Sequence, residues 1–470
     1  MKKYIYPLLA ILMLPTVLTS CFKDEEEVEV SESCYISAVS LGNLKRNIYG
    51  YTSKGMDSIY TTTFAGSHFP MTIDQRRLTI ENKDSLPTRT RLKDVPLTVT
   101  FTGALVWRKA DVTHLTDTTW TTYNSSDSLD LTEPIHLRVY SLSGKSSRTY
   151  TLKVNVHQQN GDSTVWNDLG EVNALDGLSE RKVLTWNGQL TVIALDSEQK
   201  PVSLTHPLSA EGEWTKQALT GADDARPSTL QKVGNALYML TDGMWVITSQ
   251  DGVNWEPMKM EETMTEWLTL VGGSDDYLYA LTPSGLVRSR VDNGTITWKA
   301  EKLDDEVANL PMSELNSAYY TQTNGMKRLT LIGSRSDGDT EATIWAKAWE
   351  EGQEEQEGWL YYTPNPADKY RCPILENLCV VPYDDGIQAL GGKSRNGQYA
   401  ALEHVFHSSD HGITWKTYEN DDMEVDPKLQ AAAKDAKHIS ATVDEENFLW
   451  IVADKNVWRG RINRLGFQKK

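Results

Sequence analysis

The side chains that could carry out chemistry are plentiful in this 470-residue chain, but they do not fall into a recognised catalytic order. The nine histidines are scattered without HExxH or another metal spacing, and nucleotide-binding and Gly-x-Ser-x-Gly fingerprints are absent. The segment 336–339, Ser-Asp-Gly-Asp, offers calcium-type oxygen ligands, although such loops are usually turns. The 65 Asp and Glu residues leave a glycosidase pair open without assigning one. The sequence therefore predicts no catalytic residue, no metal site and no cofactor.

The best-defined motif is SSDHGITW, residues 408–415. Ser and Asp side chains in such a turn accept hydrogen bonds from backbone N–H groups, and glycine takes the positive φ that a side chain would penalise. The motif resembles the Asp-box of bacterial sialidases and related propellers, which lies at the blade periphery between the third and fourth strands. The matching residues are Ser408, Asp410, Gly412, Thr414 and Trp415. The resemblance implies a structural role, away from any central pocket.

Two further segments have a similar sequence pattern. TSQDGVNW repeats it with Asp251, Gly252 and Trp255, and RVDNGTITW, which ends at Trp298, carries one extra residue. Sialidases also place a Tyr-Arg-Ile-Pro-like motif before their first Asp-box. Here the similar segment 370–373, Tyr-Arg-Cys-Pro, comes after three Asp-box-like units, so sialidase-type catalysis is disfavoured.

These turns belong to a repeat, marked by tryptophans at intervals of roughly 40 to 60 residues, near the length of one four-stranded propeller blade with variable loops. The repeating tryptophans are Trp214, Trp255, Trp298, Trp359 and Trp415. Apolar strands that end in glycine, at 268–274, 329–334 and 387–392, resemble those of kelch propellers. Five units run from about 180 to 420.

Closure of the repeat supplies a sixth blade. The residues after Trp415 contain up to three strands but no further Trp motif, whereas segment 163–170, which contains Trp166, stands alone before the first unit. A strand from each end of the repeat region would complete one blade and remove exposed edges. We therefore predict a six-bladed β-propeller over residues 160–470.

Residues 33–159 contain only strand-like segments that alternate apolar and polar residues, which predicts a β-sandwich. Segment 135–156 forms two strands joined by Ser-Gly-Lys, and the second is predicted to be an edge strand beginning at Tyr150. This arrangement resembles the immunoglobulin-like modules of Bacteroidota surface lipoproteins. The fold class is thus all-β, with an Ig-like sandwich before the propeller.

The amino terminus carries an address signal. Lys2 and Lys3 precede an apolar run, and segment 18–21, Leu-Thr-Ser-Cys, resembles a bacterial lipobox that ends the signal peptide at residue 20 and places a lipid on Cys21. The acidic tether, residues 21–32, begins Cys-Phe-Lys-Asp-Glu, which resembles a surface-export signal of Bacteroidota lipoproteins. A secretory signal with a chance cysteine, and a tether that only keeps the chain extended, are the alternatives.

The net charge and the cysteine content limit the binding partners and the disulfide bonds that the sequence allows. The net charge of −18 disfavours binding to nucleic acid, because phosphate backbones repel an acidic chain. Beyond Cys21 there are only Cys34, Cys372 and Cys379, which is no disulfide framework, although pairing of the last two stays open.

The chain as a whole resembles Bacteroidota surface lipoproteins with an Ig-like domain and a six-bladed propeller. The resemblance implies an outer-membrane protein that faces the cell exterior. The leading hypothesis is a glycan- or peptide-binding protein that uses the propeller channel, in association with a TonB-dependent nutrient-uptake system. A polysaccharide hydrolase or lyase in the same channel and a structural or adhesive module are the alternatives. Trp and Tyr rings could stack on sugars in the channel, but the sequence does not say which.

Overall fold

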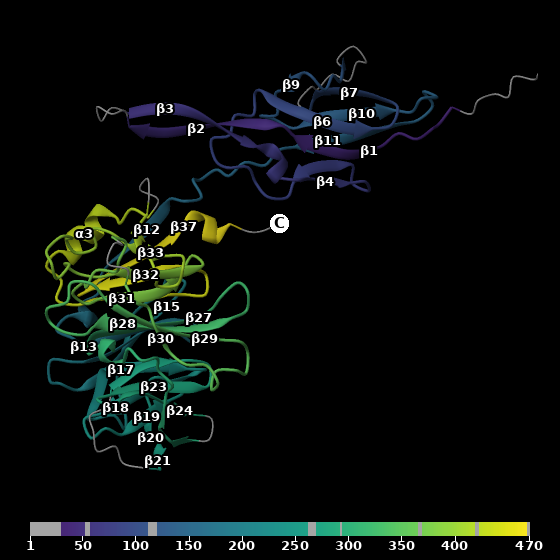
Figure 1. Ribbon diagram of the computed structural model, residues 1–470. Helices are drawn as coiled ribbons and strands as arrows, with labels where there is room; N and C mark the ends of the chain where they lie inside the picture. The colour runs from purple at the N-terminus through teal and green to yellow at the C-terminus, as the bar shows by residue number, and fades with distance from the viewer. Residues whose placement is uncertain are drawn as a thin grey trace, which may run out of the picture. The chain divides into compact units, whose positions relative to one another are not determined.

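The computed structural model describes residues 30–51, 57–110, 120–261, 269–291, 294–364, 369–418 and 423–467. The chain divides into two compact units, of which the first ends at Asn160 and the second runs from Gly161 to Phe467. Both units consist almost entirely of β-strands (Figure 1). The predicted all-β class is confirmed. Cys21, the residue predicted to carry a lipid, lies outside the described residues.

The first unit is a sandwich of two sheets around one hydrophobic core. The larger sheet has the order β4 (Met71–Asp74), β5 (Thr79–Asn82), β11 (Ser147–Lys153), β10 (Ile135–Tyr140), β7 (Ala104–Lys109), β8 (Thr121–Thr122). The smaller sheet has the order β1 (Ile36–Leu41), β6 (Val95–Phe101), β9 (Ser128–Leu129), and a separate hairpin consists of β2 (Asn43–Tyr51) and β3 (Asp57–Ala65). Alternate residues of β10 are buried, as expected for a strand with one face on the core.

The prediction that the segment beginning at Tyr150 forms an edge strand is wrong. Strand β11 pairs antiparallel with β10 and parallel with β5, where Thr151 lies opposite Thr79. It therefore lies inside the six-stranded sheet. Period-two alternation indicates that one face of a strand is buried, but it carries no information about how many neighbours the strand has.

The second unit contains six four-stranded antiparallel sheets, which are the blades of a propeller. Blade 1 consists of β13 (Ser179–Trp186), β14 (Gln189–Leu195), β15 (Pro201–Pro207) and β16 (Thr215–Ala218), and blade 2 consists of β17 (Ala225–Val233), β18 (Ala236–Thr241), β19 (Val246–Ser249) and β20 (Glu256–Pro257). Blade 3 consists of β22 (Thr269–Gly273), β23 (Tyr277–Thr282), β24 (Gly285–Arg290) and β26 (Lys299–Ala300), and blade 4 consists of β27 (Ser313–Thr321), β28 (Lys327–Ser334), β29 (Thr343–Trp349) and β30 (Leu360–Tyr361). Blade 5 consists of β31 (Cys379–Tyr383), β32 (Gly386–Leu390), β33 (Phe406–Ser408) and β34 (Lys416–Thr417).

Blade 6 is built from both ends of the unit. It consists of β35 (Ile439–Val443), β36 (Leu449–Ala453), β37 (Asn456–Ile462) and, as its outer strand, β12 (Thr164–Glu171). Trp166 of β12 lies opposite Gly460 of β37, and Figure 1 shows β12 beside the yellow β37. The predicted closure by strands from both ends of the repeat region is confirmed.

The first strand of each blade lies innermost. These strands contact one another in a closed ring, in the order β13, β17, β22, β27, β31, β35 and back to β13. Apolar residues from each pair of adjacent blades form a separate hydrophobic cluster, so the core of the propeller lies between the blades. The ring of inner strands is left to line the centre.

Some connecting elements lie outside the blades. Strands β21 (Lys259–Met260) and β25 (Thr295–Ile296) form a short parallel pair. Helix α3 (Pro427–Ala433) precedes blade 6, with proline at its first position and the Asp426 carboxylate accepting a hydrogen bond from the N–H of Lys428 (2.8 Å). Short 3₁₀ turns occupy η1 (Gly66–His68), η3 (Asn173–Leu175), η4 (Val307–Asn309) and η5 (Asn463–Gly466).

The glycine-ended strands occupy different positions within their blades. Gly272 and Gly273 end the innermost strand β22, whereas the segments near 329–334 and 387–392 belong to the second strands β28 and β32. Gly273 does allow a close approach, because a Cβ there would lie 2.1 Å from the carbonyl oxygen of Lys232 in the neighbouring blade. An apolar run followed by a small residue therefore does not specify the position of a strand within a blade.

Candidate functional site

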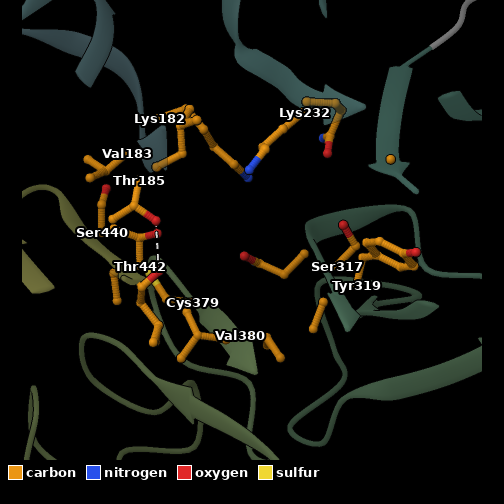
Figure 2. A pocket seen from close by; sticks show the side chains of 18 of the residues that line it. Lys182, Val183, Thr185, Lys232, Ser317, Tyr319, Cys379, Val380, Ser440 and Thr442 are labelled. Atoms are coloured by element: carbon orange, nitrogen blue, oxygen red, sulfur yellow. Dashed lines mark hydrogen bonds between the residues drawn. The ribbon is translucent and has the colours of Figure 1, made fainter. Parts of the chain in front are cut away.

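The centre of the propeller contains a cavity of about 700 Å³, lined by the innermost strand or the following turn of every blade. This volume lies within the range of ligand pockets, roughly 300 to 1,000 Å³. Blades 1 to 6 contribute, in that order, Lys182, Lys232, Asp275, Ser317, Cys379 and Ser440. We refer to this cavity as the channel site, and Figure 2 shows its labelled side chains.

One charged side chain of the channel site has a structural role. The guanidinium of Arg181 is buried and donates to the carbonyl oxygens of Asp454 and His438, each at 2.6 Å, and so joins blade 1 to blade 6. Burial lowers the pKa of Arg181 to about 10, against the opposing effect of the Asp454 carboxylate 3.7 Å away. The group remains charged at neutral pH and holds the ring closed.

The carboxylate of Asp275 is also engaged by protein groups. Its Oδ2 atom accepts hydrogen bonds from the hydroxyl of Tyr319 (2.7 Å) and from Nζ of Lys327 (2.8 Å). Burial acts to raise the pKa of Asp275, but these hydrogen bonds outweigh burial and the pKa is lowered. Asp275 is the one Asp or Glu in the described lining of the channel site, which therefore offers no second carboxylate for a glycosidase pair.

Lys182 and Lys232 are the remaining cations of the lining. In Figure 2 both side chains extend from their strands toward the middle of the cavity. Burial lowers the pKa of Lys182, and the nearby Cys379 acts in the opposite direction. Neither ammonium forms a hydrogen bond or ion pair within the part of the chain that the structure describes, although Lys232 is close enough to Asp275 to help lower its pKa.

Cys379 also lines this cavity. Burial raises its pKa to about 11, and Lys182 partly offsets that effect. Its Sγ contacts the carbonyl oxygens of Asn377 (3.3 Å) and Ile439 (3.5 Å). Cys34, Cys372 and Cys379 are all free cysteines, so Cys372 and Cys379 do not pair in this structure.

The Asp-box residues lie elsewhere, in the turn between β33 and β34. The Asp410 Oδ1 atom accepts hydrogen bonds from the Ser408 hydroxyl and the Thr414 N–H, both at 2.8 Å, and the Gly412 N–H donates to Ser408 Oγ at 2.7 Å. Gly412 has a φ of 112°, which favours glycine. Trp415 is buried in the cluster between blades 4 and 5. None of these five residues lines the channel site.

The second Asp-box has the same geometry between β19 and β20. Asp251 Oδ1 accepts hydrogen bonds from the N–H groups of Val253 (2.9 Å) and Asn254 (2.7 Å), and its other oxygen accepts from the Asn254 amide (2.7 Å). These bonds lower the pKa of Asp251 to about 2, with the Asn254 amide making the largest contribution. Gly252 has a φ of 73°.

The repeated tryptophans share one position. Each directly precedes the outer strand of its blade and packs in the cluster between that blade and the preceding one, and the five are Trp214, Trp255, Trp298, Trp359 and Trp415. Trp166, within β12, packs in the corresponding gap between blades 5 and 6. These rings are therefore absent from the channel site, where Tyr319 is the one Trp, Tyr or Phe residue in the described lining.

The Tyr370-Arg371-Cys372-Pro373 segment lies at the periphery as well. Arg371 forms an ion pair with Glu341, and together with Cys372 they line a cavity of about 320 Å³ beside Trp415. Arg371 is absent from the channel lining. Its position explains the Arg-x-Pro pattern as part of blade packing.

The comparisons with known proteins agree with this architecture. The model of the DUF6242 beta propeller domain matches residues 160–470, and that of the DUF6242 N-terminal domain, a domain of unknown function, matches residues 39–154. The chain belongs to the DUF6242 family. No curated protein matches it.

Solved structures similar to this DUF6242 chain include other propeller proteins. YCF48 from Cyanidioschyzon merolae is 13% identical over 63% of this chain and 98% of that one, with a TM-score of 0.34. PorZ, a surface component of the type-IX secretion system of Porphyromonas gingivalis, is 12% identical over 89% of this chain and 62% of that one (TM-score 0.33). The α-L-arabinanase of Penicillium chrysogenum is 8% identical over 63% and 96% (TM-score 0.37). At these values the likenesses carry no information on ligand or activity.

Two further expectations concern metals and membranes. Among the described residues, no group of three or more His, Cys, Asp or Glu side chains could hold a metal ion. Asp339 of the 336–339 loop instead binds the guanidinium of Arg335 (3.1 Å) and accepts the N–H of Ser336 (3.3 Å). No helix in the described ranges is long and apolar enough to span a bilayer.

Sequence reasoning identified none of the channel residues. Lys182 and Lys232 lie in the innermost strands β13 and β17, which also carry Arg181 and Arg226 and mix polar with apolar residues. A charged residue at the centre of a strand next to a buried one is the signal that could have marked them. That signal is weak, because exposed strand faces carry lysines equally often.

Proposed function

We propose that this DUF6242 protein is a lipid-anchored binding protein of the outer-membrane surface whose propeller channel holds a glycan or a peptide. The observation that carries the proposal is the channel site itself, a cavity of about 700 Å³ to which all six blades contribute polar side chains. Single, concave, partly polar pockets of this size are the usual place for a ligand. A purely structural propeller would be expected to fill its centre with apolar side chains.

A polysaccharide hydrolase or lyase is less well supported. Such enzymes need convergent titratable groups with free access to the substrate. The carboxylate in the described lining, Asp275, is engaged by Lys327 and Tyr319. The geometry supports binding better than cleavage.

The targeting signals at the amino terminus support the proposed location at the outer-membrane surface. The lipobox-like segment 18–21 places lipid on Cys21, and the acidic tether follows it directly. Surface exposure would allow the protein to pass a ligand to a TonB-dependent transporter. Cys21→Ala in a Bacteroidota host should abolish labelling by radioactive palmitate and release the protein from the membrane. Protease treatment of intact cells should digest the wild-type protein, and full protection would contradict surface display.

The binding function is tested with residues 22–470, which retain both units. This protein is screened on glycan and peptide arrays, with a parallel assay for polysaccharide cleavage. Ser317→Phe would place a ring inside the channel site and should abolish binding, whereas Ser197→Phe, in the exposed β14–β15 turn, should leave it intact. Cleavage of any screened polysaccharide, or a ligand that binds equally well to both variants, would overturn the proposal.

A further inference from the structure

The charges of the channel site do not balance within the protein. Arg181 is bound by carbonyl groups of blade 6 and lies near the Asp454 carboxylate, and Asp275 is bound by Lys327. Lys182 and Lys232 are left over, with no ion pair in the described residues. The central cavity of a strongly acidic protein is therefore locally positive.

One further carboxylate lies nearby. Glu314 lines a smaller adjoining cavity of about 200 Å³ that Lys182 also lines, and no ion pair joins the two. Burial raises the pKa of Glu314, and Arg395 acts in the opposite direction. Glu314 does not supply the missing partner of Lys182.

Lys182 differs from its counterparts in other blades, because its side chain forms no described hydrogen bond to the next blade. In strands β13, β17 and β27 a β-bulge interrupts the pairing, which resumes at Lys182, Gln231 and Asn316 respectively. The amides of Gln231 and Asn316 donate to the next blade, to the carbonyl oxygens of Leu270 (3.4 Å) and Leu378. Lys182 occupies the same place in blade 1, yet its ammonium makes no such bond in the described structure.

Leaving a half-buried ammonium without a partner is unfavourable. Removing a charge from water costs free energy that only an opposite charge or hydrogen-bond acceptors can offset. Burial already lowers the pKa of Lys182. A bound anion would offset the lost hydration, which is the usual logic of a pre-formed anion site.

Side chains with hydroxyl groups line the same cavity as the two lysines. Ser317, Ser440 and Thr442 line the channel site and are labelled in Figure 2. Their hydroxyls form no hydrogen bond with other described residues, whereas that of Thr185 donates to the carbonyl oxygen of Val443 (2.7 Å). Free hydroxyls donate and accept, and they match the hydroxyl groups of a sugar better than the apolar side chains of a peptide.

The aromatic residue of the lining is held in place. The ring of Tyr319 stacks on Trp349 with centroids 6.0 Å apart, and its hydroxyl is bonded to Asp275. Recognition in the channel therefore depends on charge and hydrogen bonds more than on stacking.

We propose that the channel site binds an acidic oligosaccharide, with Lys182 and Lys232 on its carboxylate and Ser317, Ser440 and Thr442 on its hydroxyl groups. This inference rests on the proposed binding function and narrows its ligand class. The carboxylate binds the two ammonium groups from blades 1 and 2, and the sugar ring extends toward the hydroxyls of blades 4 and 6.

The test is calorimetric titration of residues 22–470 with galacturonate, glucuronate and sialyl oligosaccharides, each compared with its methyl ester. We expect at least one acidic sugar to bind, and its ester to bind about tenfold more weakly or worse, as loss of a charge-assisted hydrogen bond implies. Lys182→Met and Lys232→Met should each weaken binding by about tenfold. Lys182→Arg should retain part of it. Lys216→Met, on the exposed outer strand of the same blade, is the matched control.

Thermal unfolding of each variant establishes that it is folded. The inference is overturned by equal affinity for acid and ester, by unchanged affinity in both lysine variants, by tighter binding of an aspartate tripeptide than of any sugar, or by no binding of the acidic panel. Binding of a neutral glycan that Ser317→Phe blocks would overturn the acidic ligand class while leaving the proposed function intact. If no ligand on any array depends on the channel site for binding, both the acidic ligand class and the proposed binding function are overturned.

Discussion

The indole ring of Trp166 packs directly on the backbone of Gly460, its partner in the strand pair that closes the propeller. A Cβ atom at Gly460 would lie 2.4 Å from Cε3 of Trp166, far inside van der Waals contact. The indole N–H donates to the carbonyl oxygen of Glu424 (2.8 Å), which fixes the ring in the gap between blades 5 and 6. Strand β12 thus contributes the sixth tryptophan of the propeller, and the glycine in β37 provides the space that its ring occupies.

Gly460→Ala should destabilise the propeller, because the added methyl group forces the closing strands apart. Overpacking of this kind costs about 1–3 kcal/mol. Urea unfolding of residues 22–470, followed by tryptophan fluorescence, measures the loss. Gly338→Ala is the control, since the nearest atom to its added Cβ would be 3.9 Å away. Equal midpoints for both variants would show that Trp166 does not lie where the structure places it.

A second prediction concerns the polar link across the same closure. Arg181→Met removes two hydrogen bonds from a buried guanidinium to the carbonyl groups of His438 and Asp454. Hydrogen bonds to charged groups contribute about 1.5–3 kcal/mol each, so the variant should unfold at a clearly lower denaturant concentration. Arg181→Lys should recover only part, because an ammonium lacks the planar fork that spans two acceptors. Full recovery by lysine would contradict this account.

The fold could be predicted from the sequence because its signals are local and repeated. Blades 1 to 5 each have a tryptophan directly before the outer strand, and the sequence shows these residues at regular intervals: Trp214, Trp255, Trp298, Trp359 and Trp415. Closure of the ring could be predicted by counting the repeats, because Trp166 lies before the first complete repeat and had no blade of its own. The position of a strand within its blade was less visible, because the glycine-ended segments occupy the first strand in blade 3 and the second strand in blades 4 and 5.

The candidate site could not be predicted, for a physical reason. Lys182, Ser317, Cys379 and Ser440 come together only because the inner strands of different blades form a ring. Nothing within one strand distinguishes a lysine that faces a central cavity from one that faces solvent. The bulge that precedes Lys182 and leaves its ammonium without the interblade bond of Asn316 is likewise a property of the sheet pairing.

The Asp-box should give a pH-dependent contribution to stability. The folded pKa of Asp251 is about 2, below the ordinary value of 3.8. Its stabilising effect is therefore complete above about pH 4 and is lost as the pH falls toward about 2. Asp251→Asn should unfold more easily than wild type at pH 7, and the difference should narrow below pH 4. Denaturant midpoints at pH 7, 5, 4 and 3 measure it.

The control for this experiment is Asp305→Asn. Asp305 is exposed and forms no hydrogen bond or ion pair with other described residues. The Asp305→Asn variant should have the same denaturant midpoint as the wild-type protein at every pH. A gap between Asp251→Asn and wild type that stays constant down to pH 3 would mean that the carboxylate charge has no part in the turn.

Cys379 provides a chemical probe of the channel. Because burial raises its thiol pKa to about 11, its alkylation by iodoacetamide should be slow at pH 8 and should keep rising through pH 10, since only the thiolate reacts. Lys182→Met should slow the reaction further, because the ammonium lowers the thiol pKa. The measurement uses residues 22–470 with Cys34 and Cys372 replaced by alanine, and mass spectrometry follows the adduct. A rate that levels off near pH 9 would show that the thiol is hydrated like a free cysteine, and the channel would then be more open than its lining indicates.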